Sequence, residues 1–430
     1  MPESAKKLVM NLFDNIIGYE TIRKELERTA DALKNVEYYA RLGASAPRGL
    51  LLYGDPGVGK TLMATSLIKA SGRKSFTCRK DHPDGEFIHV IRKVFDQAVQ
   101  AAPSIIFLDD LDKFANNDEN HRDSEEYVTV QSCIDAARGS EVFVLATVNE
   151  LDDLPESLIR AGRFDRIIRI DSPTGEDAAK IVQHYLAQKS CVSGIDPESV
   201  AGIMAGYSCA DLETAVNKAG LLAGYERAEE ITMRHLVLGC LDIAHRVSPD
   251  SIVTGRNDEK TLQAACHEAG HALVSELLFP GSVSAVCIYE RFGTVSGFTS
   301  YRETEKETLD YQMKIAIRSL AGRAASMHRY GVPDLGSMDD INSAQRIITN
   351  LVSDEAAYGF GLIDARISNS PVLQSLQEQC ISSKMEDCFL KAARLIAEHR
   401  DVLDAMTDEL TQKGFLVADD VRRIVESSAA

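Results

Sequence analysis

An apolar segment that runs into a glycine-rich loop and then into a helical pattern constrains the fold more than any other feature of this sequence. Residues 49–53 read Gly-Leu-Leu-Leu-Tyr, and residues 54–61 continue as Gly-Asp-Pro-Gly-Val-Gly-Lys-Thr. A strand, a loop and a helix in this order are the context of a phosphate-binding loop, whose backbone N–H groups surround phosphate oxygens at a helix N-terminus. The segment therefore predicts an α/β domain with a buried strand before the loop.

The loop also predicts which side chains bind a nucleotide. We expect Lys60 to reach the β- and γ-phosphates of ATP and Thr61 to coordinate Mg²⁺. An apolar run at 105–108 ends in Asp109, which is expected to hold Mg²⁺, and in Asp110, which is expected to orient or deprotonate the attacking water. The expected nucleotide-binding residues of the loop and the helix start are Asp55, Pro56, Gly57, Val58, Gly59, Lys60, Thr61 and Leu62.

Further apolar runs at 104–108, 142–147 and 166–170 alternate with helical patterns, which predicts a doubly wound parallel sheet. The following segments, 178–189, 211–227 and 232–245, read as helices of a small lid. We therefore expect an α/β subdomain at 1–172, a helical lid at 173–246, a polar linker broken by Pro and Gly at 247–258, and a mainly α domain at 259–430. Within the last domain, residues 283–301 alternate enough to predict a strand pair.

A second motif, His-Glu-Ala-Gly-His at 267–271, predicts a metal site. His267 and His271 lie one helical turn apart, so both imidazoles can bind one ion, and Glu268 is expected to act as general base for a metal-activated water. The alternative is a pair of structural histidines. A catalytic zinc needs a third protein ligand, and the His that some zinc hydrolases carry six residues further on is replaced by Leu277. Two imidazoles and a carboxylate would suit Zn²⁺.

Composition limits the class of protein. The 430 residues are enough for two or three domains, and a net charge of −18 argues against a nucleic-acid partner. The sequence contains no apolar run long enough for a transmembrane helix, and its start does not resemble a signal peptide. The nine cysteines are scattered, which fits reduced thiols and a cytoplasmic location, and Cys266 is expected to be a buried residue rather than a ligand.

Asn149 and residues 158–166, Leu-Ile-Arg-Ala-Gly-Arg-Phe-Asp-Arg, resemble the second region of homology of AAA+ ATPases. The resemblance implies that Asn149 positions water near the γ-phosphate. It also implies that Arg160 and Arg163 reach the neighbouring subunit's site in a hexameric ring, and surface ion pairing is the alternative for both arginines. Residues 13–18 match the family segment that lines adenine, which implicates Ile17 and Gly18, and residues 206–211 resemble its second sensor stretch.

Residues 264–274, 319–325 and 336–344 resemble the FtsH family of membrane-associated AAA+ zinc proteases. There the third zinc ligand is an Asp, which falls on Asp340, with Asp339 as the alternative. Residues 293–299 resemble the family's edge strand, which pairs with substrate by β-addition. The resemblance covers about residues 13–425 and implies a zincin-type fold, Zn²⁺, ATP with Mg²⁺, and unfolded or tagged protein substrates.

Four departures from the family pattern affect the expectations. Transmembrane helices are missing, so we expect a soluble or trimmed chain. Asp110 replaces the family's Glu, and its shorter side chain predicts slow ATP hydrolysis. Phe87 is the only aromatic candidate for the pore loop, with a core residue as the alternative. Residues 135–139 replace the family's Asp-Gly-Phe element, which predicts weaker coupling between subunits.

The leading hypothesis is a soluble, homohexameric, ATP-dependent zinc endopeptidase that unfolds, threads and degrades proteins. One alternative is a zinc peptidase with a weak motor in which the nucleotide only gates access. Another is a non-proteolytic AAA+ remodeller or scaffold.

Overall fold

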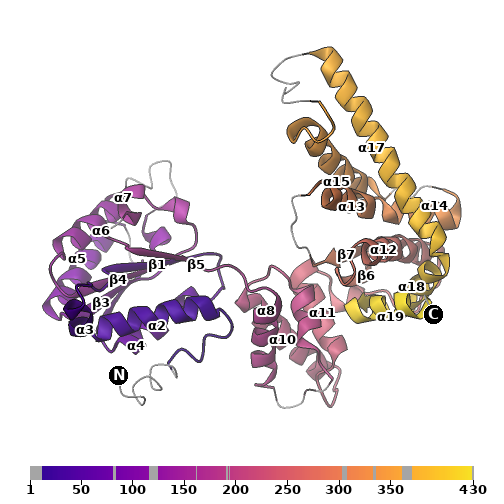
Figure 1. Cartoon of the computed structure of the whole chain (residues 1–430). Helices are drawn as coiled ribbons and strands as arrows, with labels where there is room; N and C mark the ends of the chain where they lie inside the picture. Colours follow the sequence, from indigo (N-terminus) through magenta and orange to yellow (C-terminus); the bar gives the residue numbers. More distant parts are fainter. Residues whose placement is uncertain are drawn as a thin grey trace. The chain divides into compact units, whose positions relative to one another are not determined.

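The computed structural model describes residues 12–80, 84–115, 124–160, 162–189, 192, 194–302, 308–332, 336–360 and 370–428. The chain divides into two compact units (Figure 1). The first consists of Met1–Val192 with Met204–Lys218, and the second of Ser193–Ile203 with Ala219–Ala430. The division falls inside the segment predicted as the lid.

The first unit is built on a five-stranded parallel sheet, which confirms the predicted doubly wound fold. Its strand order is β2-β3-β4-β1-β5. The strands are β1 (Gly49–Tyr53), β2 (Lys74–Cys78), β3 (Ser104–Leu108), β4 (Val142–Val148) and β5 (Arg166–Arg169). The sequence did not predict β2, because this edge strand is short, largely exposed and carries polar side chains instead of an apolar run.

Helices cover both faces of this sheet (Figure 1). Leu50 and Leu52 of β1 pack on the side of α2 (Glu20–Lys34) and α4 (Lys60–Ser71). Leu51 points to the opposite core, which α5, α6 and α7 share, because successive side chains of a strand alternate between its faces. The remaining bounds are α3 (Val36–Arg41), α5 (Asp84–Gln100), α6 (Glu125–Ala136) and α7 (Glu156–Ile159), with 3₁₀ turns at Leu111–Phe114 and Leu151–Asp153.

The region predicted as a lid is helical among the described residues. It contains α8 (Gly175–Leu186), α9 (Pro197–Ile203), α10 (Cys209–Tyr225) and α11 (Met233–His245). The segment predicted as a linker begins with a 3₁₀ turn at Pro249–Ser251 but then joins a sheet. Ile252 bridges to Tyr289, and the N–H of Val253 donates to the carbonyl of Ile288 at 3.1 Å. Val253 is buried in the core of the second unit, so this part of the segment belongs to that core.

The second unit is mostly helical and carries the predicted strand pair. Its antiparallel sheet has the order β7-β6-β8, which leaves β7 at one edge. The helix α12 (Glu259–Leu278) packs against β6, β7, α14 and α18, and its Ala265, Ala269 and Leu273 are fully buried. The strands are β6 (Val283–Arg291), β7 (Thr294–Tyr301) and β8 (Phe415–Val417). The other helices are α13 (Leu309–Ser319), α14 (Ala321–Tyr330), α15 (Met338–Thr349), α17 (Pro371–Glu398), α18 (Arg400–Lys413) and α19 (Ala418–Ser428), with a π-helical turn at Asn350–Asp354.

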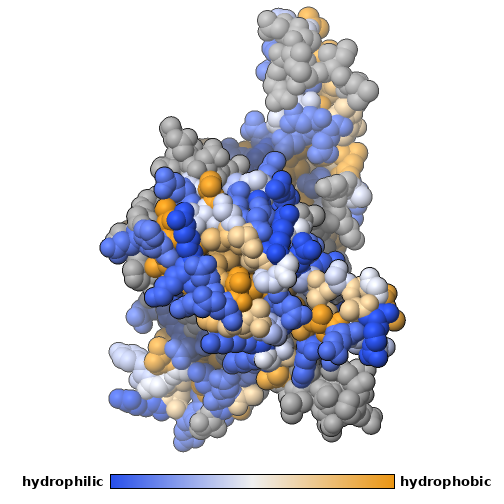
Figure 2. Space-filling model, turned by 90° about the vertical axis from the view of Figure 1, so that its left-hand side faces the viewer, coloured by the Kyte–Doolittle hydropathy of each residue, from blue (hydrophilic) through white to orange (hydrophobic). Residues whose placement is uncertain are grey.

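Hydrophilic residues surround smaller apolar patches on the face drawn in Figure 2. Among the described residues, no helix combines the length and apolar character that a membrane crossing requires.

Candidate nucleotide site and metal centre

The glycine-rich loop takes the backbone conformation that its sequence requires. Gly54, Gly57 and Gly59 have φ values of 145°, 84° and 97°, which only glycine adopts readily. The ammonium group of Lys60 folds back into the loop, where it donates to the carbonyls of Gly54 and Asp55 at 2.6 and 2.8 Å. Burial lowers the pKa of Lys60. The loop therefore surrounds a cation at the start of α4.

The tips of β3 and β4 gather the groups predicted to hold magnesium. Oδ1 of Asp109 accepts hydrogen bonds from the hydroxyls of Thr61 at 3.2 Å and Thr147 at 2.9 Å. Asp110 follows with a left-handed backbone (φ 53°), and its carboxylate pairs with Lys113 at 2.8 Å. The structure thus brings Thr61 and Asp109 together. Thr147, which also accepts from the N–H of Asp110, was not singled out from the sequence.

Asn149 connects the loop lysine to a buried acid. Its Oδ1 accepts from Lys60 at 2.9 Å, and its Nδ2 donates to Oδ2 of Asp112 at 2.8 Å. Asp112 is only 8% exposed. Sequence reasoning missed Asp112 because the motif ends at Asp110, although an acid two residues further on was a usable signal.

The segment predicted to line adenine approaches the lid stretch that was predicted as a sensor. Ile17 and Gly18 are half-buried, and the N–H of Tyr19 donates to Oδ2 of Asp177 at 3.2 Å. The hydroxyl of Tyr19 lies 3.5 Å from Sγ of Cys209.

The other loop contacts place Asp55, Pro56 and Gly57 at the surface and Val58 in the core. The N–H of Ala210 donates to the carbonyl of Gly57 at 3.1 Å, so the phosphate-binding loop touches the sensor stretch directly. Leu62 is 43% exposed at the first turn of α4.

The two arginines predicted to act in trans lie in different environments. Arg160 is exposed, whereas Arg163 is 5% exposed and its Nη2 lies 2.6 Å from Oδ2 of Asp135. The side chain of Arg163 also donates to the carbonyl of Ser157. The trans role of both residues stays a prediction.

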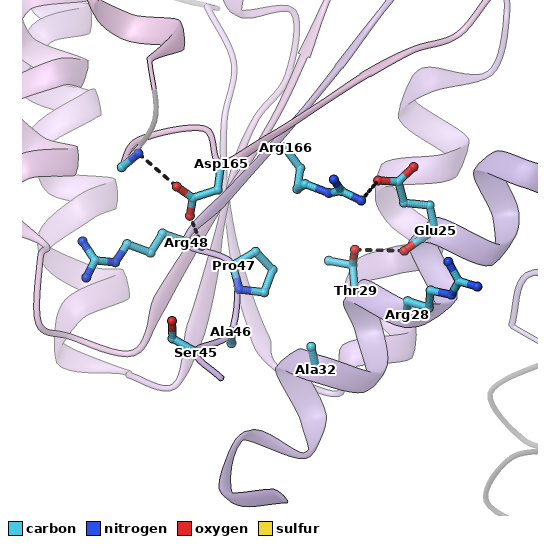
Figure 3. Close-up of a pocket in the computed structure, with 11 residues that line it drawn as sticks. Glu25, Arg28, Thr29, Ala32, Ser45, Ala46, Pro47, Arg48, Asp165 and Arg166 are labelled. Atoms are coloured by element: carbon cyan, nitrogen blue, oxygen red, sulfur yellow. Dashed lines mark hydrogen bonds and ion pairs between the residues drawn. The ribbon is translucent and has the colours of Figure 1, made fainter. Parts of the chain in front are cut away.

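The loop that carries these arginines is anchored by Asp165. Its carboxylate accepts from the N–H of Gly162 at 2.9 Å and from the N–H of Arg48 at 2.8 Å (Figure 3). Next to it, Arg166 pairs with Glu25 of α2 at 2.5 Å. Asp165, Arg166 and Glu25 are among the residues that line an open cavity of about 520 Å³.

The aromatic candidate for the pore loop was wrong. Phe87 is fully buried on α5 and packs edge-on against Phe114, with ring centroids 4.9 Å apart. It is a core residue of the helix, which was the alternative. Residues 81–83 of the predicted pore-loop stretch lie outside the described residues.

The predicted metal ligands come together in the second unit. Nε2 of His267 and Nε2 of His271 lie 3.1 Å apart on α12, and Oδ2 of Asp340 on α15 lies 3.1 and 3.3 Å from them. Asp339 is exposed and is not part of the cluster. The geometry therefore supports Asp340, and not the alternative Asp339, as the third metal ligand.

The cluster fits a tetrahedral zinc ion. Zinc–ligand bonds of about 2.0–2.2 Å place neighbouring ligand atoms about 3.3–3.6 Å apart, close to the three distances observed here. Nδ1 of His271 lies 2.9 Å from the carbonyl of Arg318. A hydrogen bond to that carbonyl puts the proton on Nδ1 and leaves the Nε2 lone pair directed at the cluster.

The charge of Asp340 also supports a metal site. Burial acts against the ionised carboxyl of Asp340, but its close contacts with the imidazoles of both histidines outweigh it and hold its pKa below the ordinary range. A carboxylate that stays ionised beside two imidazoles is a metal-binding donor set.

Glu268 lies beside this cluster, on the side of β7. It is 7% exposed, and burial raises its pKa. The hydroxyl of Thr299 on β7 donates to Oε2 of Glu268 at 2.8 Å. The sequence indicated the general base but not Thr299, because a contact between a helix and a strand leaves no local pattern.

Two glycines let other elements approach the site. A Cβ atom at Gly322 of α14 would lie 2.4 Å from Nε2 of His271, and one at Gly297 of β7 would lie 2.4 Å from Cγ of Glu268. Neither side chain could fit without displacing these residues. Both positions were missed by sequence reasoning.

Comparisons with known proteins assign both parts of the chain. Residues 50–172 match the ATPase family associated with various cellular activities (AAA), and residues 254–424 match peptidase family M41. The fold and the two sites thus define an AAA ATPase joined to an M41 metallopeptidase.

Proteins named as ATP-dependent zinc metalloproteases are similar to most of this chain. The chain is 30% identical to the ATP-dependent zinc metalloprotease FtsH 2 of Symbiobacterium thermophilum over 96% of its own length and 74% of that protein. It is 32% identical to FtsH of Pseudomonas putida over 89% of its length and 62% of that protein. It is 29% identical to FtsH of Ureaplasma parvum, of which it spans 58%. The chain belongs to the FtsH family of ATP-dependent zinc metalloproteases.

Proposed function

We propose that this protein is a zinc endopeptidase that uses ATP hydrolysis to unfold, thread and degrade protein substrates. One observation carries the proposal: His267, His271 and Asp340 present three ligand atoms within 4.8 Å of one another, with Glu268 beside them. A structural metal site has no need for a buried general base. The presence of Glu268 therefore supports hydrolysis.

The chain's own residues supply most of the peptide-bond chemistry. Zinc, when bound, polarises the substrate carbonyl and acidifies water. Glu268 accepts the proton of the attacking water and returns it to the leaving amine, which the pKa raised by burial favours. The edge strand β7 offers main-chain groups for pairing with an extended substrate, which gives affinity with little sequence selectivity.

The ATPase part supports a motor that works as a ring. In this proposal Lys60, Thr61 and Asp109 bind ATP with Mg²⁺, and Asn149 and Asp110 order the attacking water. The contacts of Lys60 with Asn149 and of Thr61 with Asp109 support these roles. We propose a homohexamer in the cytoplasm in which the exposed Arg160 contacts the γ-phosphate of the adjoining subunit.

Arg163 and Asp110 modify the proposed ATPase mechanism. The ion pair with Asp135 suits Arg163 to fix the position of the arginine loop in its own chain. Asp110 has the shorter carboxylate, so slow hydrolysis stays part of the proposal.

A zinc peptidase with a nucleotide gate is the closest rival, and a non-proteolytic remodeller is the next. Cleavage of an unfolded protein such as casein separates the remodeller from the others. We expect cleavage in the wild type, loss of cleavage with a chelator, and loss of cleavage in Glu268→Gln while zinc remains bound. An inactive wild type loaded with zinc, or normal cleavage by Glu268→Gln, would overturn the proposal.

A further inference from the structure

The hydroxyl of Thr299 on β7 contacts the general base directly. It donates to Oε2 of Glu268 at 2.8 Å and lies 3.2 Å from the main-chain oxygen of the same residue. Glu268 is buried, so few groups can orient its carboxylate. One oxygen is thus held by Thr299, and Oε1 remains for proton transfer.

The strand geometry explains how Thr299 reaches this position. Gly297 and Thr299 are two residues apart, so both lie on the same face of β7. A Cβ at Gly297 would lie 2.9 Å from Oε1 of Glu268. The missing side chain lets the strand approach α12 closely enough for the hydroxyl two residues later to contact the carboxylate.

The same strand is the sheet edge proposed to pair with substrate. Thr299 pairs with Val286 of β6 on one side, and no strand among the described residues pairs with the other side of β7. A substrate that adds to this edge therefore bonds to the backbone of the strand whose side chain orients the base. Binding and base position are connected through a single residue.

We propose that Thr299 is a positioning residue that fixes the carboxylate of Glu268 for proton transfer and couples this orientation to substrate pairing on β7. The proposal rests on the proposed peptidase function. This role requires the hydroxyl donor of Thr299 but not its methyl group. Ser should therefore function in place of Thr, whereas the near-isosteric Val should not.

The test compares Thr299→Val, Thr299→Ser and Thr254→Val in the full chain with an internally quenched peptide. Thr254 is an exposed threonine of the second unit outside β7, so it controls for the chemical change itself. General bases contribute about 10²–10⁴-fold, and we expect Thr299→Val to lose about 10- to 100-fold of kcat with KM unchanged. Thr299→Ser should recover most of the rate, and Thr254→Val should match the wild type.

Two readouts besides activity complete the test. Zinc content should equal that of the wild type in every variant, and a peptide hydroxamate should bind more weakly to Thr299→Val than to Thr299→Ser. Wild-type kcat in Thr299→Val, a change in KM alone, zinc loss, or a Ser variant as slow as the Val variant would overturn the proposal. If Glu268→Gln also cleaves normally, the peptidase function itself fails, whereas an inactive Glu268→Gln beside a normal Thr299→Val refutes only the role of Thr299.

Discussion

The guanidinium of Arg163 is bound within its own chain, with Nη2 2.6 Å from Oδ2 of Asp135. Arg160, three residues earlier, is exposed. The same motif predicts the same role for both arginines, but their surroundings differ. Only Arg160 is available in this structure to contact another subunit without breaking an ion pair.

This difference predicts that Arg160 acts in trans. Arg160→Ala and Lys60→Ala should each lower ATP hydrolysis by about 10³-fold or more, because one removes the charge that stabilises the transition state and the other removes phosphate binding. Rings that contain both variants should regain measurable ATPase activity, since a Lys60→Ala subunit still offers its arginine to an intact neighbouring site. Mixed rings as inactive as either variant would contradict a role in trans.

The side-chain length of Asp110 should limit the rate of ATP hydrolysis. Asp110→Glu should raise kcat for ATP hydrolysis several-fold, because one added methylene brings the carboxylate closer to the attacking water. Asp110→Asn should abolish turnover while ATP still binds. The measurement is phosphate release at saturating ATP. A Glu variant no faster than the wild type would refute slow hydrolysis as a consequence of the shorter side chain.

Zinc binding should separate the two neighbouring aspartates of α15. Asp340→Ala removes an atom 3.1 Å from Nε2 of His267, whereas Asp339→Ala changes an exposed side chain. Loss of an outer-sphere partner alone costs about 10- to 100-fold in metal affinity, so Asp340→Ala should lose more than that. Competition with a chelating dye measures this affinity. Equal affinity in both variants would exclude Asp340 as a ligand.

Gly322 predicts a steric effect on the same site. A Cβ there would lie 2.4 Å from Nε2 of His271, so Gly322→Ala should displace a ligand and weaken zinc binding. Gly224→Ala is the matched control, because a Cβ at that helical position meets no atom within 4 Å. The control should bind zinc normally and should keep or slightly raise the thermal stability. Normal zinc binding by Gly322→Ala would show that α14 can move away.

Much of both sites could be predicted from the sequence because their chemistry sits in short motifs. The loop at 54–61 and the pair His267 and His271 are local in the chain, so spacing alone places their side chains together. The strand β2 was missed because an exposed edge strand needs no apolar run. The family resemblance favoured Asp340 over Asp339, but residue spacing alone could not make this choice, since it depends on how α15 is rotated against α12.

The residues that contact the two sites from other elements could not be predicted either. Thr147, Thr299 and Gly322 touch the sites from other elements, and their roles arise only when helices and strands pack. Phe87 was only a candidate for the pore loop, and the alternative held, since this aromatic residue is buried in the core. Sequence spacing identifies the reacting groups but not what holds them.

The most direct test of the account is the rate of casein degradation with ATP compared with the rate with a non-hydrolysable ATP analogue, in protein loaded with zinc. We expect degradation well above background with ATP, and degradation near background with the analogue or in Lys60→Ala. Equal rates with ATP and the analogue would contradict it, because the nucleotide would then gate a peptidase that needs no motor.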